Sequence, residues 1–113
     1  MIGRKDEPFV RDGEAEWQPA GEGVVRKVLT YSDRVMMVRV RFEAGAVGPP
    51  HSHPHVQCTL VESGVFDVTI AGRTERLRAG DSFLVPPHAE HDARNIEAGT
   101  LLDVFTPMRR DFV

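Results

Sequence analysis

Short apolar runs separated by glycine- and proline-containing turns recur along this chain from Val24 onward. In the run 35–42, three apolar residues alternate with Arg39 and Arg41, which places a core face and a polar face on one strand. No window has the period and length of an amphipathic helix. The predicted strands are 24–30, 35–42, 56–62, 65–70, 74–77, 82–85 and 100–106, with turns at Ser63-Gly64, Ala71-Gly72 and Ala79-Gly80-Asp81. We therefore expect an all-β chain that folds as a small two-sheet jelly-roll β-barrel.

The length of 113 residues is enough for one domain with one core. Residues 1–20 are polar and carry Pro8, Gly13 and Pro19, so they are expected to form an N-terminal arm, and residues 21–113 a single barrel domain. Phe9 and Trp17 in this arm are costly to leave in water. The arm is therefore expected to pack on its own barrel or on a partner subunit, and a homodimer is predicted.

Charge and hydropathy exclude several functions. The formal net charge is −3 and the arginines are scattered, so no nucleic-acid partner is expected. No apolar run approaches membrane-spanning length, and the first residues lack a secretory hydrophobic stretch, so a cytoplasmic location without a membrane partner is predicted. The single cysteine, Cys58, allows no internal disulfide, and we expect it to be a small buried apolar residue.

All histidines of the chain lie in two short clusters, HSHPH at 51–55 and the pair His88 and His91. Imidazole is the commonest metal ligand at neutral pH. His51, His53 and Gln57 have the same parity, so an extended segment would present all three side chains on one face. A fourth donor must come from a distant segment, and His91 follows a strand-like run that ends in a proline pair. This pattern predicts that His51, His53, Gln57 and His91 meet inside the barrel.

Such a donor set predicts one divalent transition metal ion, with zinc, nickel, iron, cobalt and manganese all acceptable to three imidazoles and one amide oxygen. His55 and His88 are interpreted as pocket-lining, supporting or exposed loop residues rather than ligands. Thr59 has the parity of Gln57, and we expect it either to line the pocket or to have a structural role across strands.

The histidine clusters resemble the two motifs of the cupin family. The positions that carry the resemblance are Gly45, His51, His53 and Gly64 in the first motif and Gly80, Pro86, His91 and Asn95 in the second. The resemblance implies the cupin double-stranded β-helix, a jelly-roll β-barrel. Gln57 stands where the family usually has glutamate, and His88 where it usually has glycine. Because a neutral amide leaves the cation its full positive charge, the site favours Lewis-acid chemistry over oxygenase chemistry.

The closing segment DVFTPMRRDF, residues 103–112, resembles that of a small single-domain group, the KdgF-like cupins. This group is associated with converting 4,5-unsaturated monouronates from pectin or alginate to linear keto forms. The resemblance implies that Asp103 is an acid/base residue, Phe105 a pocket wall and Arg109 the anchor for a substrate carboxylate. Asp103 and Phe105 share parity in an otherwise apolar strand, which agrees with a common face.

Alternatives remain open at each level. Asp103 could be a strand-end residue that backbone donors or an arginine satisfy. The choice of Arg109 over Arg110 rests on the resemblance alone, and either could form an ordinary surface salt bridge. The predicted function is a metal-dependent isomerase acting on an unsaturated sugar acid. Other readings are a different metal-dependent enzyme, such as a polyketide cyclase or dioxygenase, and a module that binds a metal or small acid without catalysis.

Overall fold

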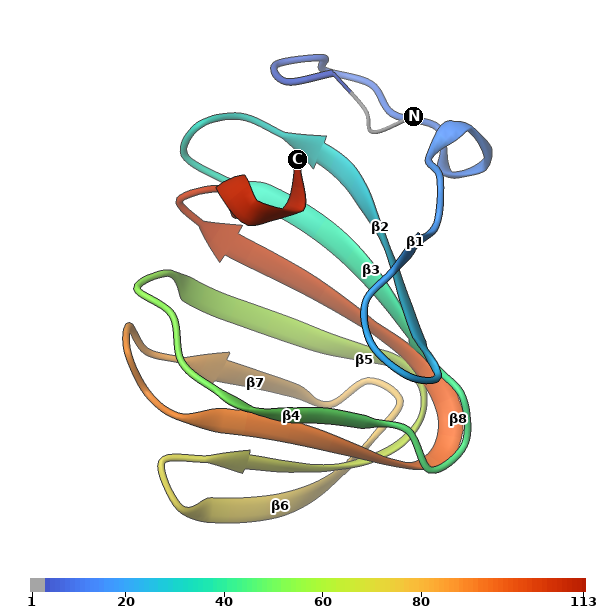
Figure 1. The fold of residues 1–113 in the computed structure, drawn as a ribbon, viewed down its shortest axis with the longest axis vertical. Coiled ribbons are helices and arrows are strands. Elements are labelled where there is room, and N and C mark those ends of the chain that lie inside the picture. Colours follow the sequence, from blue (N-terminus) through green and yellow to red (C-terminus); the bar gives the residue numbers. More distant parts are fainter. Residues whose placement is uncertain (1–3) are drawn as a thin grey trace.

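The computed structural model describes residues 4–113, which form antiparallel strands with two single-turn 3-10 helices (Figure 1). The strands are β1 (Gln18–Pro19), β2 (Val24–Tyr31), β3 (Met36–Phe42), β4 (Val47–His51), β5 (Val56–Ile70), β6 (Arg73–Arg78), β7 (Ser82–Val85) and β8 (His91–Thr106). The helices are η1 (Asp12–Glu14) and η2 (Arg110–Phe112). The predicted all-β jelly roll is confirmed.

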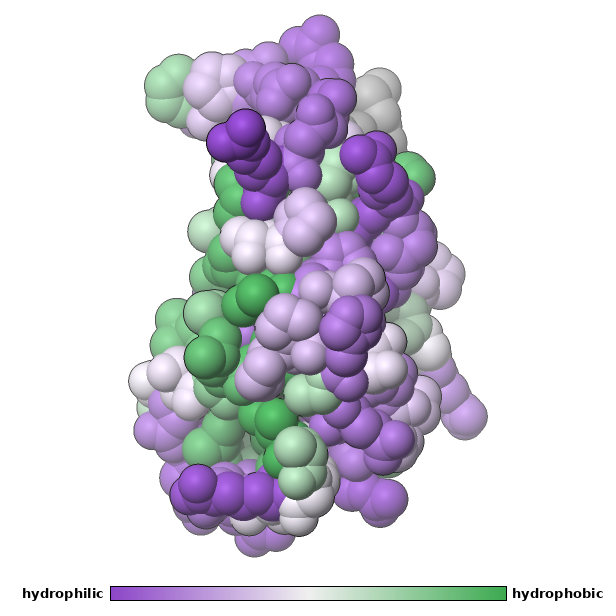
Figure 2. Space-filling view, turned by 90° about the vertical axis from the view of Figure 1, so that its left-hand side faces the viewer, coloured by the Kyte–Doolittle hydropathy of each residue, from purple (hydrophilic) through white to green (hydrophobic). Residues whose placement is uncertain are grey.

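Two long strands, β5 and β8, form the central pair of the barrel. They pair with each other from Val56 opposite Thr106 to Ile70 opposite His91. The strand order is β1-β2-β3-β8-β5-β6, while β4 pairs with β8 and β7 with β5. In Figure 1 the strands fan apart on the left and draw together on the right, where β8 bends. The open side of the fan faces the viewer in Figure 2, where hydrophobic residues form a band beside a hydrophilic region.

The predicted turn at Ser63-Gly64 is wrong, because the two runs 56–62 and 65–70 form the single strand β5. The pairing with β8 shifts register around Ser63 and Val65, and Gly64 has a φ of 81°. A Cβ on Gly64 would lie only 2.5 Å from the carbonyl oxygen of Glu97. Glycine therefore marks a bulge at which two strands bend together, not a chain reversal.

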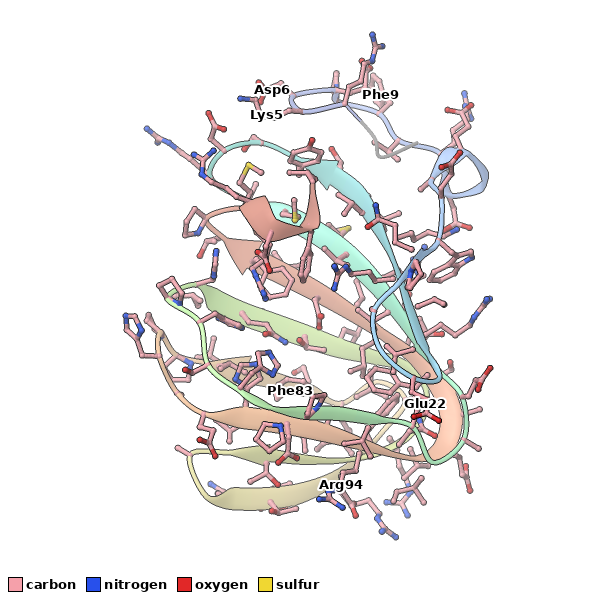
Figure 3. All side chains as sticks on the ribbon, in the orientation of Figure 1. Lys5, Asp6, Phe9, Glu22, Phe83 and Arg94 are labelled. Carbon is pink, nitrogen blue, oxygen red and sulfur yellow. The ribbon has the colours of Figure 1, made fainter. Side chains whose placement is uncertain are left out.

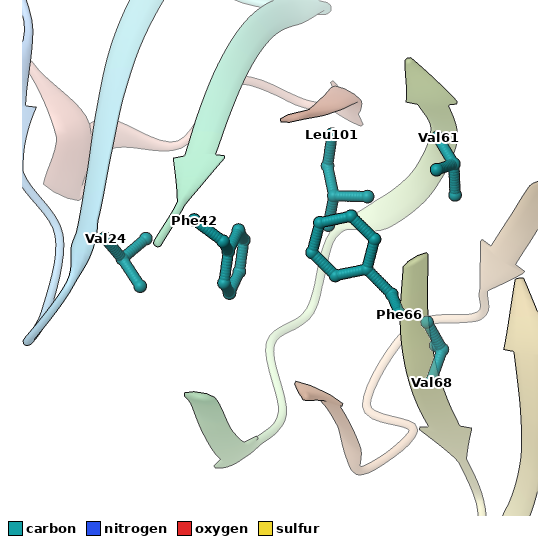
Figure 4. Packing of buried hydrophobic residues seen from close by; sticks show 6 residues of the cluster. All are labelled: Val24, Phe42, Val61, Phe66, Val68 and Leu101. Carbon is teal, nitrogen blue, oxygen red and sulfur yellow. The ribbon is translucent and has the colours of Figure 1, made fainter. Parts of the chain in front are cut away.

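The apolar core lies inside the barrel and consists of two clusters of buried residues. Phe42 and Phe66 meet edge to face with ring centroids 5.1 Å apart. The first buried cluster, drawn in Figure 4, contains Val24, Phe42, Val61, Phe66, Val68 and Leu101. A second cluster surrounds Phe105 and contains Val28, Tyr31, Met36, Val38 and Met108. Both clusters border the cavity, because Val24 and Phe42 of the first and Phe105 of the second are among its lining residues.

The N-terminal segment contacts β2 of its own barrel. Trp17 lies under two cations, with Nζ of Lys27 and Cζ of Arg41 each 4.4 Å from a ring centroid. The range predicted as an arm also includes β1, which pairs with β2. Phe9 is 85% exposed and points away from the barrel in Figure 3.

The outer face of the β8–β5–β7 layer is apolar. Cys58 was expected to be buried, but it is exposed on this face, because β5 turns Gln57 and Thr59 inward and Cys58 outward. Leu60 and Leu84 are also exposed here, by 42% and 55%. No helix within residues 4–113 combines the length and the apolar character needed to cross a membrane.

Candidate metal centre and substrate pocket

A cavity of about 300 Å³ lies inside the barrel, at the lower end of the size range of small-molecule sites. Predicted site residues that line it are His51, Gln57, His91, Asp103, Phe105 and Arg109. Phe83, which also lines the cavity, lies inside the fan of strands in Figure 3, whereas Arg94 lies at its outer edge. The structure therefore brings residues from both predicted motifs and from the closing segment to one place.

Three histidines converge on one point. The side chains of His51, His53 and His91 offer ligand nitrogens that all lie within 4.8 Å of one another. His51 ends β4 and His91 begins β8, and the two residues are register partners in that strand pair. Their ring centroids are 4.2 Å apart. His53, in the loop after β4, has its ring centroid 4.8 Å from that of His91.

Backbone carbonyls orient all three rings. Nδ1 lies 2.9 Å from the Pro49 oxygen in His51, 3.2 Å from the His55 oxygen in His53, and 3.0 Å from the Ala89 oxygen in His91. Because a carbonyl only accepts hydrogen bonds, these contacts favour the tautomer with the proton on Nδ1, which leaves the Nε2 lone pair for a metal ion.

The pKa values of the two buried histidines, His53 and His91, are also suited to metal binding. Burial is the main cause that lowers the pKa of both His53 and His91, which favours the neutral form that binds metals. Nε2 of His91 is buried and has no hydrogen-bond partner within residues 4–113. A buried acceptor without a partner is unfavourable, and a cation at this point would satisfy it.

Gln57 directs its oxygen to the same point. Oε1 lies 3.0 Å from Nε2 of His53, while the amide nitrogen donates to Oγ1 of Thr59 at 3.0 Å and to Oδ1 of Asp103 at 3.4 Å. The donors of the amide are thus occupied on the side away from the histidines. The oxygen is left to act as the fourth ligand that the sequence predicts.

Asp103 is buried beside this centre. Oγ1 of Thr59 donates a 2.6 Å hydrogen bond to its Oδ1. Burial raises the pKa of Asp103 to about 6, although the bonds from Thr59 and Gln57 and the charge of Arg109 act to lower it. Within residues 4–113 its hydrogen-bond donors are the neutral side chains of Thr59 and Gln57, and neither a backbone amide nor an arginine donates to it. Thr59, whose role was open, supports the Asp103 carboxylate.

The closing segment places Arg109, not Arg110, in the cavity wall. The Arg109 guanidinium lies over two rings, with Cζ 5.0 Å from the centroid of Phe105 and 4.3 Å from that of Phe112. Its Nε and Nη2 donate to the Asp111 carboxylate at 3.1 and 2.9 Å. Burial acts to raise the pKa of Asp111, but these bonds hold it below the ordinary value. One edge of the predicted carboxylate anchor is thus engaged within the chain.

Two other histidines lie outside the cluster. His88 is exposed with a φ of 67°, and its backbone amide donates to the His53 carbonyl at 2.7 Å, which ties the two histidine loops together. The ring centroid of His55 is 6.2 Å from that of Phe105. Neither His55 nor His88 belongs to the three-histidine cluster.

Sequence reasoning missed three charged residues of the cavity lining, Arg26, Asp92 and Asp111. Arg26 on β2 lines the cavity, and its Cζ lies 3.7 Å from the Phe112 ring centroid. The signal was available, because Val24, Arg26 and Val28 share parity in a strand whose Val24 and Val28 are core residues.

Comparison with known proteins agrees with this geometry. Residues 38–105 match the cupin domain family. The chain belongs to the cupin family. This cupin is 40% identical over 104 residues to the pectin degradation protein KdgF of Dickeya dadantii (strain 3937), a match that covers 90% of this chain and 94% of the relative. The predicted resemblance to the KdgF-like group is therefore confirmed.

Two solved structures share the whole fold of this cupin. KdgF from Halomonas sp. is 38% identical with a TM-score of 0.89, and the match covers 95% of this chain and 99% of that one. An RmlC-like cupin from Shewanella frigidimarina NCIMB 400 is 39% identical with a TM-score of 0.93, covering 96% and 98%.

Proposed function

We propose that this cupin is a metal-dependent enzyme that converts 4,5-unsaturated monouronates, derived from pectin or alginate, to linear keto forms. The observation that carries the proposal is the juxtaposition of the three-histidine cluster and the buried carboxylate of Asp103 along one cavity. The similarity to two KdgF proteins supports it, since one of them is a pectin degradation protein.

His51, His53, His91 and Gln57 would hold one divalent transition metal, and zinc, nickel, iron, cobalt and manganese all suit these donors. When bound, the ion supplies Lewis-acid polarisation of a sugar oxygen. None of the four donors carries a negative charge, so the ion would keep its full positive charge for this polarisation.

Asp103 is proposed to move the proton. Ring opening breaks the bond between the anomeric carbon and the ring oxygen while the anomeric hydroxyl loses its proton. The enolate left at C5 then becomes a ketone when C4 gains that proton, so the net reaction is an isomerisation. Asp103 can accept the first proton and return one to C4, because its carboxylate lines the cavity and Thr59 and Gln57 hold it in place.

Arg109 and Phe105 are proposed to position the sugar. Phe105 is almost fully buried and forms an apolar wall beside Asp103. Arg109 retains donors on the edge of its guanidinium that Asp111 does not use, and these suit a carboxylate oxygen.

The test is to incubate metal-loaded protein with an unsaturated monogalacturonate and follow its vinyl proton by NMR. Conversion to a linear keto acid without uptake of dissolved oxygen supports the proposal. Recovery of the unchanged acid would favour the non-catalytic binding module. Oxygen uptake with a phenolic or polyketide substrate, in place of conversion, would favour a dioxygenase or cyclase.

We further propose that the protein is a homodimer whose subunits pair through the outer apolar face. A shallow groove there is lined by Cys58, Leu60, Leu84, Leu102 and Val104. A salt bridge between Arg39 and Glu62, 2.9 Å long, lies at its margin. Paired charges around an apolar centre suit a second copy of the same face, related by a two-fold axis.

A further inference from the structure

Arg26 occupies a position where the fold would place an apolar side chain. It lies on β2 between Val24 and Val28, which are both core residues, and opposite Val40 on β3. A charged group on an inward-facing strand position is expensive unless another group pairs with it. The partner of this guanidinium must therefore come either from the chain or from a bound ligand.

The chain supplies only part of that partner. Cζ of Arg26 lies 3.7 Å from the Phe112 ring centroid, a cation–π contact that covers one face of the guanidinium. Nε of Arg26 is buried and has no hydrogen-bond partner within residues 4–113. A buried donor without an acceptor lowers stability, and a ligand that brings an acceptor would recover that loss.

The carboxylate that acts on Arg26 electrostatically is already engaged. Asp111 influences Arg26 electrostatically, but its two carboxylate oxygens accept hydrogen bonds from Nε and Nη2 of Arg109. The cavity lining contains two guanidiniums, Arg26 and Arg109, and three carboxylates, Asp92, Asp103 and Asp111. Within residues 4–113 none of these carboxylates accepts a hydrogen bond from Nε of Arg26. Burial is the main cause that lowers the pKa of Arg26, yet an arginine stays protonated in proteins.

We propose that Arg26 is a second carboxylate-binding residue, which joins Arg109 in selecting small acids over neutral sugars. The inference rests on the proposed function only in naming the acid as a uronate. The Phe112 ring holds both guanidiniums, since Arg109 Cζ also lies 4.3 Å from its centroid. Asp111 keeps Arg109 in place, and Arg26 offers its unused donors to the ligand.

Binding measurements test the inference without requiring turnover. Metal-loaded protein is titrated with D-galacturonate and with D-galactose, which differ in a carboxylate against a hydroxymethyl group. The wild type should prefer the acid by at least about tenfold, since a charge-assisted hydrogen bond is strong. Arg26→Gln should lose most of this preference. Arg110→Gln removes the same charge from an exposed neighbour of the site and should keep it.

A second variant and a turnover assay distinguish failure of this inference from misfolding and from failure of the proposed function. Should Arg26→Gln fail to fold, Arg26→Lys keeps the charge but lacks the guanidinium fork, and it should bind the acid several-fold more weakly. A folded variant with unchanged preference for the acid overturns the inference. In turnover of an unsaturated monogalacturonate, Arg26→Gln should raise KM far more than it lowers kcat. Wild-type protein that prefers galacturonate but never turns over an unsaturated uronate would contradict the proposed function and leave the role of Arg26 supported.

Discussion

Oε1 of Gln57 lies 3.0 Å from Nε2 of His53, which has no hydrogen to donate when the proton is on Nδ1, the nitrogen beside the His55 carbonyl. Two acceptors this close repel each other unless a cation lies near both. The amide cannot turn away at no cost, because its nitrogen donates to Thr59 and Asp103. The buried carboxylate thus sets the direction of the proposed fourth ligand, and metal binding and proton transfer share one hydrogen-bond network.

Gln57→Glu should therefore bind a divalent cation more tightly than the wild type, since a carboxylate adds charge to a neutral donor set. Without metal the variant should be less stable, because the new carboxylate would lie beside Asp103 in a buried site. Competition of zinc with a chelating dye measures affinity, and thermal unfolding with and without zinc measures stability. His91→Ala is the opposite control and should lose most of the affinity. Equal zinc affinity in all three proteins would contradict the proposed ligand set.

Asp103→Asn should lower turnover of an unsaturated monouronate by about 10²-fold or more, because an amide cannot shuttle the proton. Bound metal and fold should be retained, and the melting temperature should not fall, since the change removes a buried charge while keeping an acceptor for Thr59. Metal analysis and thermal unfolding check both points. Asp67→Asn, which alters the carboxylate paired with Arg76 on the outside of β5, is the matched control. Retained turnover in Asp103→Asn would rule out the assigned role.

Gly64→Ala should destabilise the fold by about 2–4 kcal/mol, because it combines a positive φ with a close backbone contact. Gly72→Ala is the matched control, since Gly72 has a φ of 84° but no heavy atom within 4 Å of an added Cβ. It should cost only about 1 kcal/mol. Urea unfolding measures both variants, and equal losses would show that the approach of β5 and β8 at Gly64 is not tight.

Leu84→Lys should convert the predicted homodimer to a monomer, because it places an unpaired charge in the centre of the outer apolar face. Val47→Lys makes the same change at an exposed residue of β4 outside that face, and the dimer should persist. Light scattering coupled to size-exclusion chromatography reports the mass of each protein. A monomeric wild type at tens of micromolar would contradict the dimer.

The sequence predicted the strands with clear alternation and missed those without it. β3 and β7 lie where the pattern placed them, within one residue at each end. β4 was missed because Pro49 and Pro50 obscure a strand signal, and the first half of β8 because its residues do not alternate. The bulge at Gly64 looked like a turn, since both need glycine with a positive φ.

The spacing along the chain predicted which ligands meet, but not the strand that was to carry them, because β4 ends at His51 and β5 begins at Val56. His51, His53 and His91 converge as spacing predicted, and Gln57 points to the same place. A salt bridge of Arg109 was left open as an alternative, but its partner, Asp111, was not predicted because the contact depends on the turn that η2 makes. The homodimer, the cytoplasmic location, the domain boundary and the catalytic roles stay predictions.

The most direct test of the central claim is the ultraviolet absorbance of an unsaturated monouronate incubated with the protein, with chelator, and with chelator followed by excess metal. We predict that the absorbance falls with the native protein, persists after chelation, and falls again when metal is restored. Absorbance that persists in metal-replete protein, or that falls equally fast after complete removal of metal, would contradict the account.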